Sequence, residues 1–360
     1  MRKRLLLLIL FILPGFTNAD FYKTEVVADG LSHPWSIDFL PDGDYLVAMK
    51  SGEVRQISAS GKISDAIAGG PATYFESQGG YFDIVVDPAF RDNYTIYLSY
   101  ADGPANANAT TIMKAKLLNN SFQEQETIYR ANHTKDTPLH YGGKMLFLAD
   151  GTLLVTTGDG FEYREAAQNT YSHLGKTIRI NTEGKALPDN PFAQGGGDPM
   201  VYSYGHRNPQ GLDVTSNGII YLHEHGPKGG DELNVIKAGA NYGWPAVTYG
   251  DNYTGAYVSP LKEYPGTIQP EHYWSPSIAP SGLVIYEGEM FPEWRGDFLV
   301  GALVDKEVRR LVTKNDTVVE AQALFSELGE RVRDIREGPN GELYILTDGE
   351  DGKVIRVTRK

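Results

Sequence analysis

Short apolar segments separated by turns that contain Gly, Asp or Asn recur along the whole chain. Six times an apolar strand leads through a tight turn into a second strand rich in β-branched and aromatic residues. Stretches with helical periodicity are scarce, and only short segments such as residues 163–174 are candidates for helix. The six repeats occupy residues 39–48, 85–100, 146–159, 213–226, 291–303 and 337–348.

These repeats predict an all-β fold in which each hairpin belongs to one four-stranded antiparallel blade. Six blades, joined by insertions of unequal length, would surround a central channel as a six-bladed β-propeller. The alternative is a pair of β-sandwiches whose hairpins resemble one another only in turn chemistry. The propeller is favoured because a sandwich rarely needs so many similar units. No linker is visible, so residues 20–360 are predicted to form one domain.

Residues 1–19 have the pattern of a secretory signal peptide. Arg2, Lys3 and Arg4 precede an apolar run over residues 5–13, and small residues stand before Asp20. The run is short for a bilayer span, although a membrane-anchoring helix is the alternative interpretation. We therefore expect a periplasmic or secreted protein that is not inserted in a membrane once the signal peptide has been cleaved.

The chain is acidic, with 46 Asp and Glu residues against 33 Lys and Arg residues and a net charge of −13. Residues 1–19 carry three basic residues and no acidic one, so their removal would bring the net charge to −16. Such a charge opposes binding to nucleic acid and to anionic membranes. An anionic ligand would need a local cluster of cations. The absence of cysteine excludes disulfides and thiolate chemistry.

A histidine and a carboxylate flank the hairpin of the third repeat. His140 precedes two glycines in the motif LHYGGK, and Asp159 lies where the repeat ends. Adjacent strands could bring the two side chains together. A carboxylate that binds one imidazole nitrogen leaves the other nitrogen available as a base. The alternative is a histidine whose hydrogen bonds are satisfied within a turn.

Three arginines are candidates for the cluster of cations. Arg207 is followed by Asn208 in HRNPQG, where the guanidinium suits a carboxylate and the amide suits a carbonyl or amide edge. Arg331 and Arg333 would share one face of a strand, which is costly unless an anion lies between them. A structural arginine that bridges blades and a solvated strand face are the alternatives.

The segment EHGPKGGDELN, residues 224–234, is rich in potential oxygen ligands. Gly226 and Pro227 can present consecutive carbonyl oxygens, Glu232 adds a carboxylate, and the turn at Tyr242 adds further backbone oxygens. Oxygen ligands without thiolates favour Ca²⁺ over zinc or copper. Two further polar residues at apparent blade mouths are Gln78 and Tyr253.

The chain resembles the soluble glucose/sorbosone dehydrogenase family over nearly its whole length, from about residue 23 to residue 357. Within that family it is most similar to the bacterial aldose sugar dehydrogenases. The resemblance implies a six-bladed propeller that uses pyrroloquinoline quinone (PQQ) and Ca²⁺ to oxidise aldoses at the anomeric carbon to lactones. The motifs that carry it, in order, include PWSIDFLPDG, QGGYFDIVVDPAF, LHYGGKM, HLGKTIRIN, YGHRNPQG, EHGPKGGDELN, NYGWP, SPSIAPSG and RVRDIREGPNG.

The resemblance also implies roles for individual residues. His140 would be the general base, and Asp159 would be the acid that supports it. Electrons would leave through an acceptor that the sequence does not identify. The residues implied to contact the quinone are Gln78, Arg207, Asn208, Tyr253, Arg331 and Arg333. Gly226 and Pro227 are implied to bind a catalytic calcium ion. Glu232 and Tyr242 are implied to bind a structural calcium ion.

One position departs from the family pattern. Val304 stands where relatives commonly have a lysine that pairs with a cofactor carboxylate. Lys306, two residues further on, is predicted to reach the same side of a strand and to bind the cofactor instead. This departure keeps open a propeller that only binds a glycan or a protein. A calcium-dependent lactonase is a second alternative, which the arginine pair fits poorly.

Overall fold

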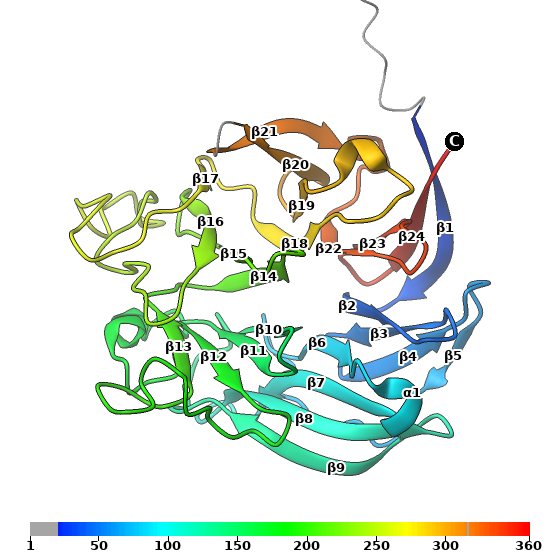
Figure 1. Cartoon of the computed structure of the whole chain (residues 1–360), viewed down its shortest axis with the longest axis horizontal. Helices are drawn as coiled ribbons and strands as arrows, with labels where there is room; N and C mark the ends of the chain where they lie inside the picture. The colour runs from blue at the N-terminus through cyan, green and yellow to red at the C-terminus, as the bar shows by residue number, and fades with distance from the viewer. Residues whose placement is uncertain (1–20, 315–316) are drawn as a thin grey trace, which may run out of the picture.

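The computed structural model describes residues 21–314 and 317–360, and β-strands make up most of its regular structure. Six four-stranded antiparallel sheets are arranged in a ring (Figure 1). This arrangement confirms the predicted six-bladed β-propeller. The predicted signal peptide lies outside the described residues. In the part of the chain that the structure describes, no helix has the length and apolar character needed to cross a membrane.

In each of the first five blades, four consecutive strands run from the channel outward. The first strands of neighbouring blades contact one another around the whole ring and form the wall of the channel. The strands of the first three blades are β2 (Pro34–Phe39), β3 (Tyr45–Met49), β4 (Glu53–Ile57) and β5 (Ile63–Ala66); β6 (Tyr81–Val86), β7 (Thr95–Asp102), β8 (Ala109–Leu118) and β9 (Ser121–Arg130); and β10 (Gly142–Phe147), β11 (Leu153–Thr157), β12 (Lys176–Ile180) and β13 (Val201–Tyr204).

The sixth blade is completed by a strand from the other end of the chain. β1 pairs antiparallel with β24, Tyr22 opposite Arg359, so the two ends of the described chain close the ring together (Figure 1). The remaining strands are β14 (Pro209–Val214), β15 (Ile220–Glu224), β16 (Asp231–Ile236) and β17 (His272–Trp274); β18 (Pro280–Ile285), β19 (Phe298–Ala302), β20 (Glu307–Lys314) and β21 (Thr317–Leu324); and β22 (Val332–Glu337), β23 (Leu343–Thr347), β24 (Gly352–Arg359) and β1 (Tyr22–Leu31).

The helical elements are short and lie between strands. Of the stretch 163–174, which was a candidate for helix, only a five-residue 3₁₀ helix forms, because the segment runs as a loop between β11 and β12. The helical elements are α1 (Phe90–Asn93) and the 3₁₀ helices η2 (Arg164–Gln168), η3 (Pro292–Trp294) and η4 (Ser326–Leu328).

Five of the six sequence repeats span the turn that joins the first and second strands of one blade, whereas the repeat over residues 291–303 begins after β18 and contains the 3₁₀ helix η3 and β19. In the third blade, for example, Leu146 on β10 pairs with Leu154 on β11. Since the strands are antiparallel, the residue before each first strand lies beside the residue after the second strand. Both positions therefore open onto the same end of the channel in every blade.

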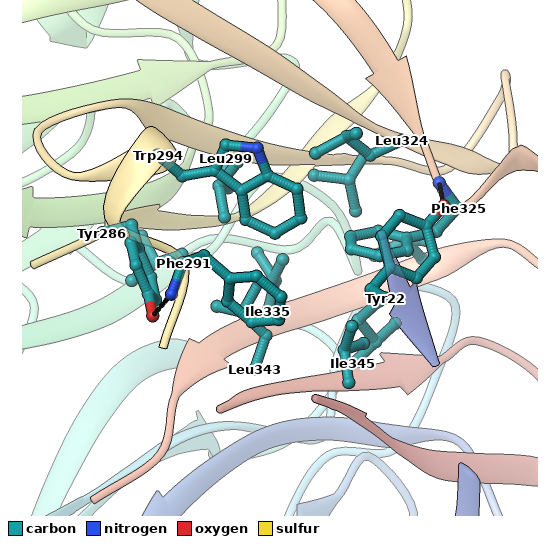
Figure 2. Packing of buried hydrophobic residues seen from close by; sticks show 14 of the residues in the cluster. Tyr22, Tyr286, Phe291, Trp294, Leu299, Leu324, Phe325, Ile335, Leu343 and Ile345 are labelled. Atoms are coloured by element: carbon teal, nitrogen blue, oxygen red, sulfur yellow. Dashed lines mark hydrogen bonds between the residues drawn. The ribbon is translucent and has the colours of Figure 1, made fainter. Parts of the chain in front are cut away.

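Apolar side chains from neighbouring blades form the core between the sheets. Between the fifth and sixth blades, the rings of Phe291 and Trp294 stack with their centroids 4.5 Å apart. They pack with Tyr22 from β1, Leu299 from β19 and Ile335 from β22 (Figure 2). Burial of each such side chain stabilises the fold by about 1.5–3 kcal/mol. This packing fixes the blades relative to one another and so fixes the channel wall.

Charged side chains from three blades meet in the interior of the ring. Nζ of Lys144 on β10 lies 3.5 Å from Asp83 on β6 and 3.4 Å from Asp334 on β22. Arg336 on β22 contacts the same two carboxylates at 3.4 and 3.5 Å. Because the second and sixth blades are not neighbours, these ion pairs cross the channel, and both carboxylates are fully buried.

Candidate active site

A cavity of about 380 Å³ lies at the end of the ring where the first strands begin, and residues from all six blades line it. Asn208 and Gln210 flank the first residue of β14, and Arg331 and Arg333 flank the first residue of β22. Residues two positions apart on extended backbone point to the same side. The strand pattern therefore places polar side chains from distant parts of the chain around one space.

His140 and Asp159 form a buried pair beside this cavity. Nδ1 of His140 lies 2.6 Å from Oδ1 of Asp159, and both side chains are almost or completely buried. His140 precedes β10 and Asp159 follows β11, so the hairpin of the third blade brings them together as predicted. The backbone N–H of His140 also donates to Oε1 of Gln78 at 2.8 Å. The histidine is thus held at both its backbone and its ring.

The surroundings keep Asp159 ionised and His140 neutral. Burial would raise the pKa of Asp159, but the charges and hydrogen bonds of His140 and the charge of Arg207 outweigh burial and lower it. Burial lowers the pKa of His140, and Asp159 opposes this only in part. Because an ionised carboxylate only accepts hydrogen bonds, Nδ1 of His140 carries the hydrogen. Nε2 then has a free lone pair and can act as a base.

Two further donors hold the Asp159 carboxylate in place. Nε1 of Trp244 donates to Oδ2 at 2.7 Å, and the backbone N–H of Phe161 donates to Oδ1 at 2.7 Å. The Phe161 ring meets the His140 ring edge-on, with the centroids 5.1 Å apart. The carboxylate therefore has a fixed orientation, which in turn fixes the imidazole that it binds.

A second cavity, of about 320 Å³, borders on Phe161, the residue that contacts both His140 and Asp159. Arg207, Pro227, Trp244 and Tyr253 line it together with Phe161. The Tyr253 side chain is 61% exposed, so it forms part of the outer rim. His140 itself is buried and lines neither cavity, but Gln78, which binds its amide, lines the first and Phe161, which packs on its ring, lines the second.

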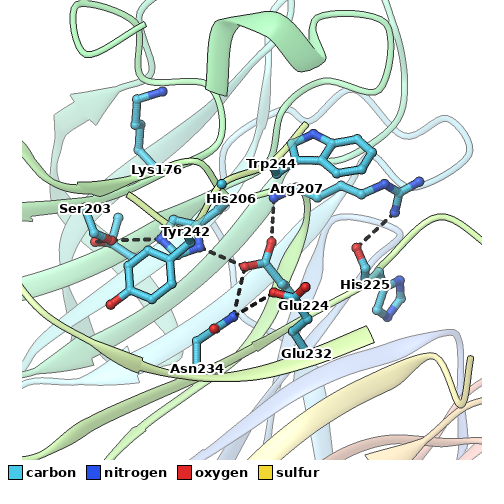
Figure 3. Close-up of polar contacts among 12 residues, drawn as sticks. Lys176, Ser203, His206, Arg207, Glu224, His225, Glu232, Asn234, Tyr242 and Trp244 are labelled. Atoms are coloured by element: carbon cyan, nitrogen blue, oxygen red, sulfur yellow. Dashed lines mark hydrogen bonds and ion pairs between the residues drawn. The ribbon is translucent and has the colours of Figure 1, made fainter. Parts of the chain in front are cut away.

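Arg207 is buried and is held by two carbonyl groups. Its Nη1 donates to the carbonyl oxygens of Gly226, at 2.7 Å, and His225, at 3.1 Å. The guanidinium carbon lies 5.3 Å from the centre of the Trp244 ring (Figure 3). The predicted metal carbonyl of Gly226 thus faces Arg207, and Pro227 follows on the wall of the second cavity.

Two carboxylates lie close together behind Arg207. Glu224 accepts from Nδ1 of His206 at 2.8 Å, and Asn234 donates to both Glu224 and Glu232 at 3.4 and 3.3 Å (Figure 3). Burial, followed by the negative charge of Glu224, raises the pKa of Glu232 to about 8. Glu232 and Tyr242 line a small space that also borders on Glu224. A cation there would relieve the repulsion between the two carboxylates.

Among residues 21–314 and 317–360, no three His, Cys, Asp or Glu side chains are placed to share a metal ion. A cation beside Glu232 would therefore need backbone oxygens as well as carboxylates. The carbonyl of Tyr242 accepts no hydrogen bond within these described ranges, whereas its amide donates to the carbonyl of Tyr204. Such a mixture of carboxylate and carbonyl oxygens is typical of Ca²⁺ ligation.

The two arginines of the sixth blade share one carboxylate at the rim of the first cavity. Nε of Arg331 lies 3.0 Å from Oδ2 of Asp348, and Nη2 of Arg333 lies 3.2 Å from Oδ1. Arg333 stacks on the Trp35 ring at 3.8 Å, whereas Arg331 also donates to the carbonyl of Leu303. Two guanidinium groups share a single negative charge, which leaves positive charge available for an anionic ligand.

The comparisons with known proteins agree with this architecture. The family model for glucose/sorbosone dehydrogenase matches residues 31–356. The chain belongs to this family. It is 36% identical over 344 residues to the aldose sugar dehydrogenase YliI of Escherichia coli, and the match covers 93% of this chain and 92% of that protein. The predicted family membership is therefore confirmed.

Solved structures of family members show the same architecture. The apo-form of the soluble aldose sugar dehydrogenase from Escherichia coli superimposes with a TM-score of 0.91 at 35% identity, covering 94% of this chain and 100% of that chain. The PQQ-bound form of the aldose sugar dehydrogenase from Streptomyces coelicolor gives a TM-score of 0.77 at 26% identity, covering 94% and 98%.

The structure corrects the prediction that Lys306 lies on a strand. Val304 and Lys306 occupy the turn that joins β19 to β20, and Lys306 has a positive φ of 58°. The alternation of side chains along a strand does not apply in a turn. Both side chains are exposed, and Lys306 lines neither of the two cavities. The geometry therefore does not support the predicted role of Lys306 as a cofactor ligand.

Three residues with no predicted role contact predicted site residues: Trp244 donates to Asp159, Asp348 binds Arg331 and Arg333, and Trp35 stacks on Arg333. Asp348 follows the second strand of the sixth blade as Asp159 follows that of the third. The repeated position was therefore a signal that could have identified it. Trp244 lies in a long loop between β16 and β17, where no repeat indicates which side chain turns inward.

Proposed function

We propose that this chain is a PQQ-dependent aldose dehydrogenase that oxidises the anomeric carbon of its substrate to a lactone. The observation that carries the proposal is the buried His140–Asp159 pair, whose contact partners Gln78 and Phe161 line two cavities that arginines also line. Members of the same family with similar structures are aldose sugar dehydrogenases, and one of those structures has PQQ bound.

The residues present fit a cofactor with three carboxylates and a quinone ring. Arg331 and Arg333 line the first cavity and Arg207 lines the second, so three cations border the space around His140. Asn208 lines the first cavity and can bind a carbonyl or amide edge. PQQ, when bound, would supply the hydride acceptor that no amino-acid side chain provides.

The chain's own part in the reaction is to orient the sugar and to accept a proton. The free Nε2 of His140 would take the proton of the anomeric hydroxyl as the C1–H bond breaks and a hydride leaves C1. The sugar thus loses one hydride and one proton and becomes the lactone. Asp159 would stabilise the imidazolium that forms, and Trp244 would hold Asp159 in position.

Calcium would be held by the oxygen atoms of the fourth blade. The carbonyls of Gly226 and Pro227 are proposed for a catalytic ion, which would share the Gly226 oxygen with Arg207. Glu232 and the carbonyl of Tyr242 are proposed for a structural ion, because the crowding of Glu224 and Glu232 favours a nearby cation. A bound Ca²⁺ supplies Lewis-acid polarisation of a carbonyl oxygen.

Export to the periplasm, or secretion, remains part of the proposal. It is supported by the basic and apolar pattern of residues 1–19. The domain limits, with residues 20–360 forming one propeller, likewise stay a prediction.

Reconstitution of the purified apoprotein tests the proposed function. The apoprotein is mixed with PQQ and Ca²⁺, and an aldose and an artificial dye acceptor are then added; the dye is expected to be reduced. Removal of Ca²⁺ with a strong chelator is expected to abolish turnover until the ion is restored. Dye reduction that is indifferent to chelation would contradict the role of calcium. Lactone opening without PQQ would instead identify a hydrolase, and neither activity would identify a binding propeller.

A further inference from the structure

Lys50 occupies the same position in the first blade that Asp348 occupies in the sixth. It follows β3 as Asp348 follows β23, and both side chains line the first cavity. Its amide donates to the carbonyl of His33 at 2.9 Å, and its carbonyl accepts from the amide of Tyr81 at 3.3 Å. The backbone of Lys50 is thus fixed by the first and second blades.

The side chain of Lys50 is directed along the cavity wall. Nζ donates to the carbonyl of Ser77 at 2.6 Å and lies 5.7 Å from the centre of the Trp35 ring and 5.5 Å from that of Phe75. Gly80 has a φ of 140°, and a Cβ there would collide with the carbonyl oxygen and Cγ of Lys50. The absence of a side chain at position 80 therefore leaves room for the lysine.

Lys50 and Arg333 are two cations on the same aromatic ring. Arg333 stacks on Trp35 at 3.8 Å, while Lys50 lies at a greater distance from that ring. Burial, followed by the positive charge of Arg333, lowers the pKa of Lys50, and Asp348 and Glu76 oppose this. Within the described ranges, Lys50 makes no ion pair, whereas Arg331 and Arg333 both bind Asp348.

The charges that line the first cavity do not balance. Lys50, Arg331 and Arg333 carry three positive charges, and Asp348 carries one negative charge. An excess of positive charge in a partly enclosed space is unfavourable unless an anion occupies it. The whole chain is strongly acidic, so this local excess is a feature of the cavity and does not follow from the composition.

We propose that Lys50 binds a carboxylate of the cofactor, the role that the resemblance implies for a lysine at position 304, where this chain has valine. The inference rests on the proposed function, since it assumes that PQQ enters the first cavity. Val304 is 56% exposed and uncharged, and Lys306 points from a turn outside the cavity lining. Lys50 is the cation that the first blade adds to the two arginines of the sixth.

The affinity of the apoprotein for PQQ, measured by equilibrium dialysis in the presence of Ca²⁺, tests this inference. Lys50→Gln is expected to weaken binding about tenfold or more, which is the usual loss for a hydrogen bond to a charged group. Lys50→Arg keeps a cation that can bind a carboxylate and is expected to lose less affinity than Lys50→Gln. Lys306→Gln, the matched control at an exposed lysine, is expected to leave the affinity unchanged.

The trimethyl ester of PQQ separates an ionic role of Lys50 from a structural one. The ester lacks the negative charges, so its affinity is expected to be the same for the wild type and for Lys50→Gln. Equal loss for PQQ and for the ester would show that Lys50 only supports the Ser77 loop and would overturn the inference. Unchanged PQQ binding by Lys50→Gln would also overturn it.

Wild-type protein that fails to bind PQQ would remove the proposed function and this inference together. If the wild type and Lys50→Gln bind PQQ with the same affinity, only the proposed role of Lys50 is refuted. The two failures are therefore distinguished within the same set of dialysis measurements.

Discussion

His140→Ala is expected to lower kcat for aldose oxidation by about 10²–10⁴-fold, which is the usual contribution of a positioned general base. The variant loses the imidazole that Asp159 orients. PQQ binding is expected to persist, because the cations that border the cavities remain in place. Steady-state kinetics with a dye acceptor and equilibrium dialysis with PQQ measure the two properties separately.

His133→Ala is the matched control for this substitution. His133 is exposed and its ring contacts Ser172 and not Asp159, so its loss is expected to leave kcat within a factor of about two. Turnover of His140→Ala close to that of the wild type would refute the assignment of the base. Loss of PQQ binding in the same variant would instead show that His140 is needed to hold the cofactor.

The pH dependence of the wild type provides an independent check on the base. Only the neutral imidazole can accept a proton, and burial lowers the pKa of His140 below its ordinary value of 6.5. kcat/KM, which reports the groups of the free enzyme, is therefore expected to hold as the pH is lowered to 6.5 and to fall only in more acidic solution. A loss of activity in the wild type that is centred above pH 6.5 would contradict the assignment of a buried, neutral histidine as the base.

Lys144→Met is expected to lower the free energy of unfolding by about 3–5 kcal/mol, the usual cost of removing one partner from a buried ion pair. Lys144 lies between Asp83 and Asp334, two fully buried carboxylates from different blades. Without the lysine, Arg336 alone would have to balance both of them. Thermal and urea unfolding of the apoprotein, followed by circular dichroism, measure the effect.

Lys116→Met is the control for a lysine at the surface. Its Nζ pairs with Glu124 of the same blade, and the two side chains are 39% and 65% exposed. Such pairs contribute about 0–1 kcal/mol, so the control is expected to unfold almost as the wild type does. Equal stability of the two variants would show that the ion pairs across the channel do not hold the blades together.

The fold could be predicted because its repeated unit is local. Each repeat is a hairpin whose strands and turn are specified by residues close in sequence, and six such hairpins have few arrangements other than a ring. The pairing of His140 with Asp159 followed from the same local geometry, since both residues lie at the open end of one hairpin.

Contacts between blades were harder to predict. Trp244 reaches Asp159 from a loop 85 residues away, and no periodicity in that loop indicates which side chain turns inward. Lys306 was placed on a strand because the chain has strand character on both sides of it, but the turn between β19 and β20 changes its direction. Lys50 was missed because a lysine after a strand is usually a solvated residue.

An experimental structure of the apoprotein soaked with PQQ and Ca²⁺ tests the location of the site most directly. The quinone ring is expected beside His140, with its carboxylates facing Arg331, Arg333 and Lys50 in the cavity where the first strands begin. PQQ bound at any other surface, or an empty cavity under conditions in which the protein oxidises aldoses, would contradict the central claim that this cavity holds the cofactor.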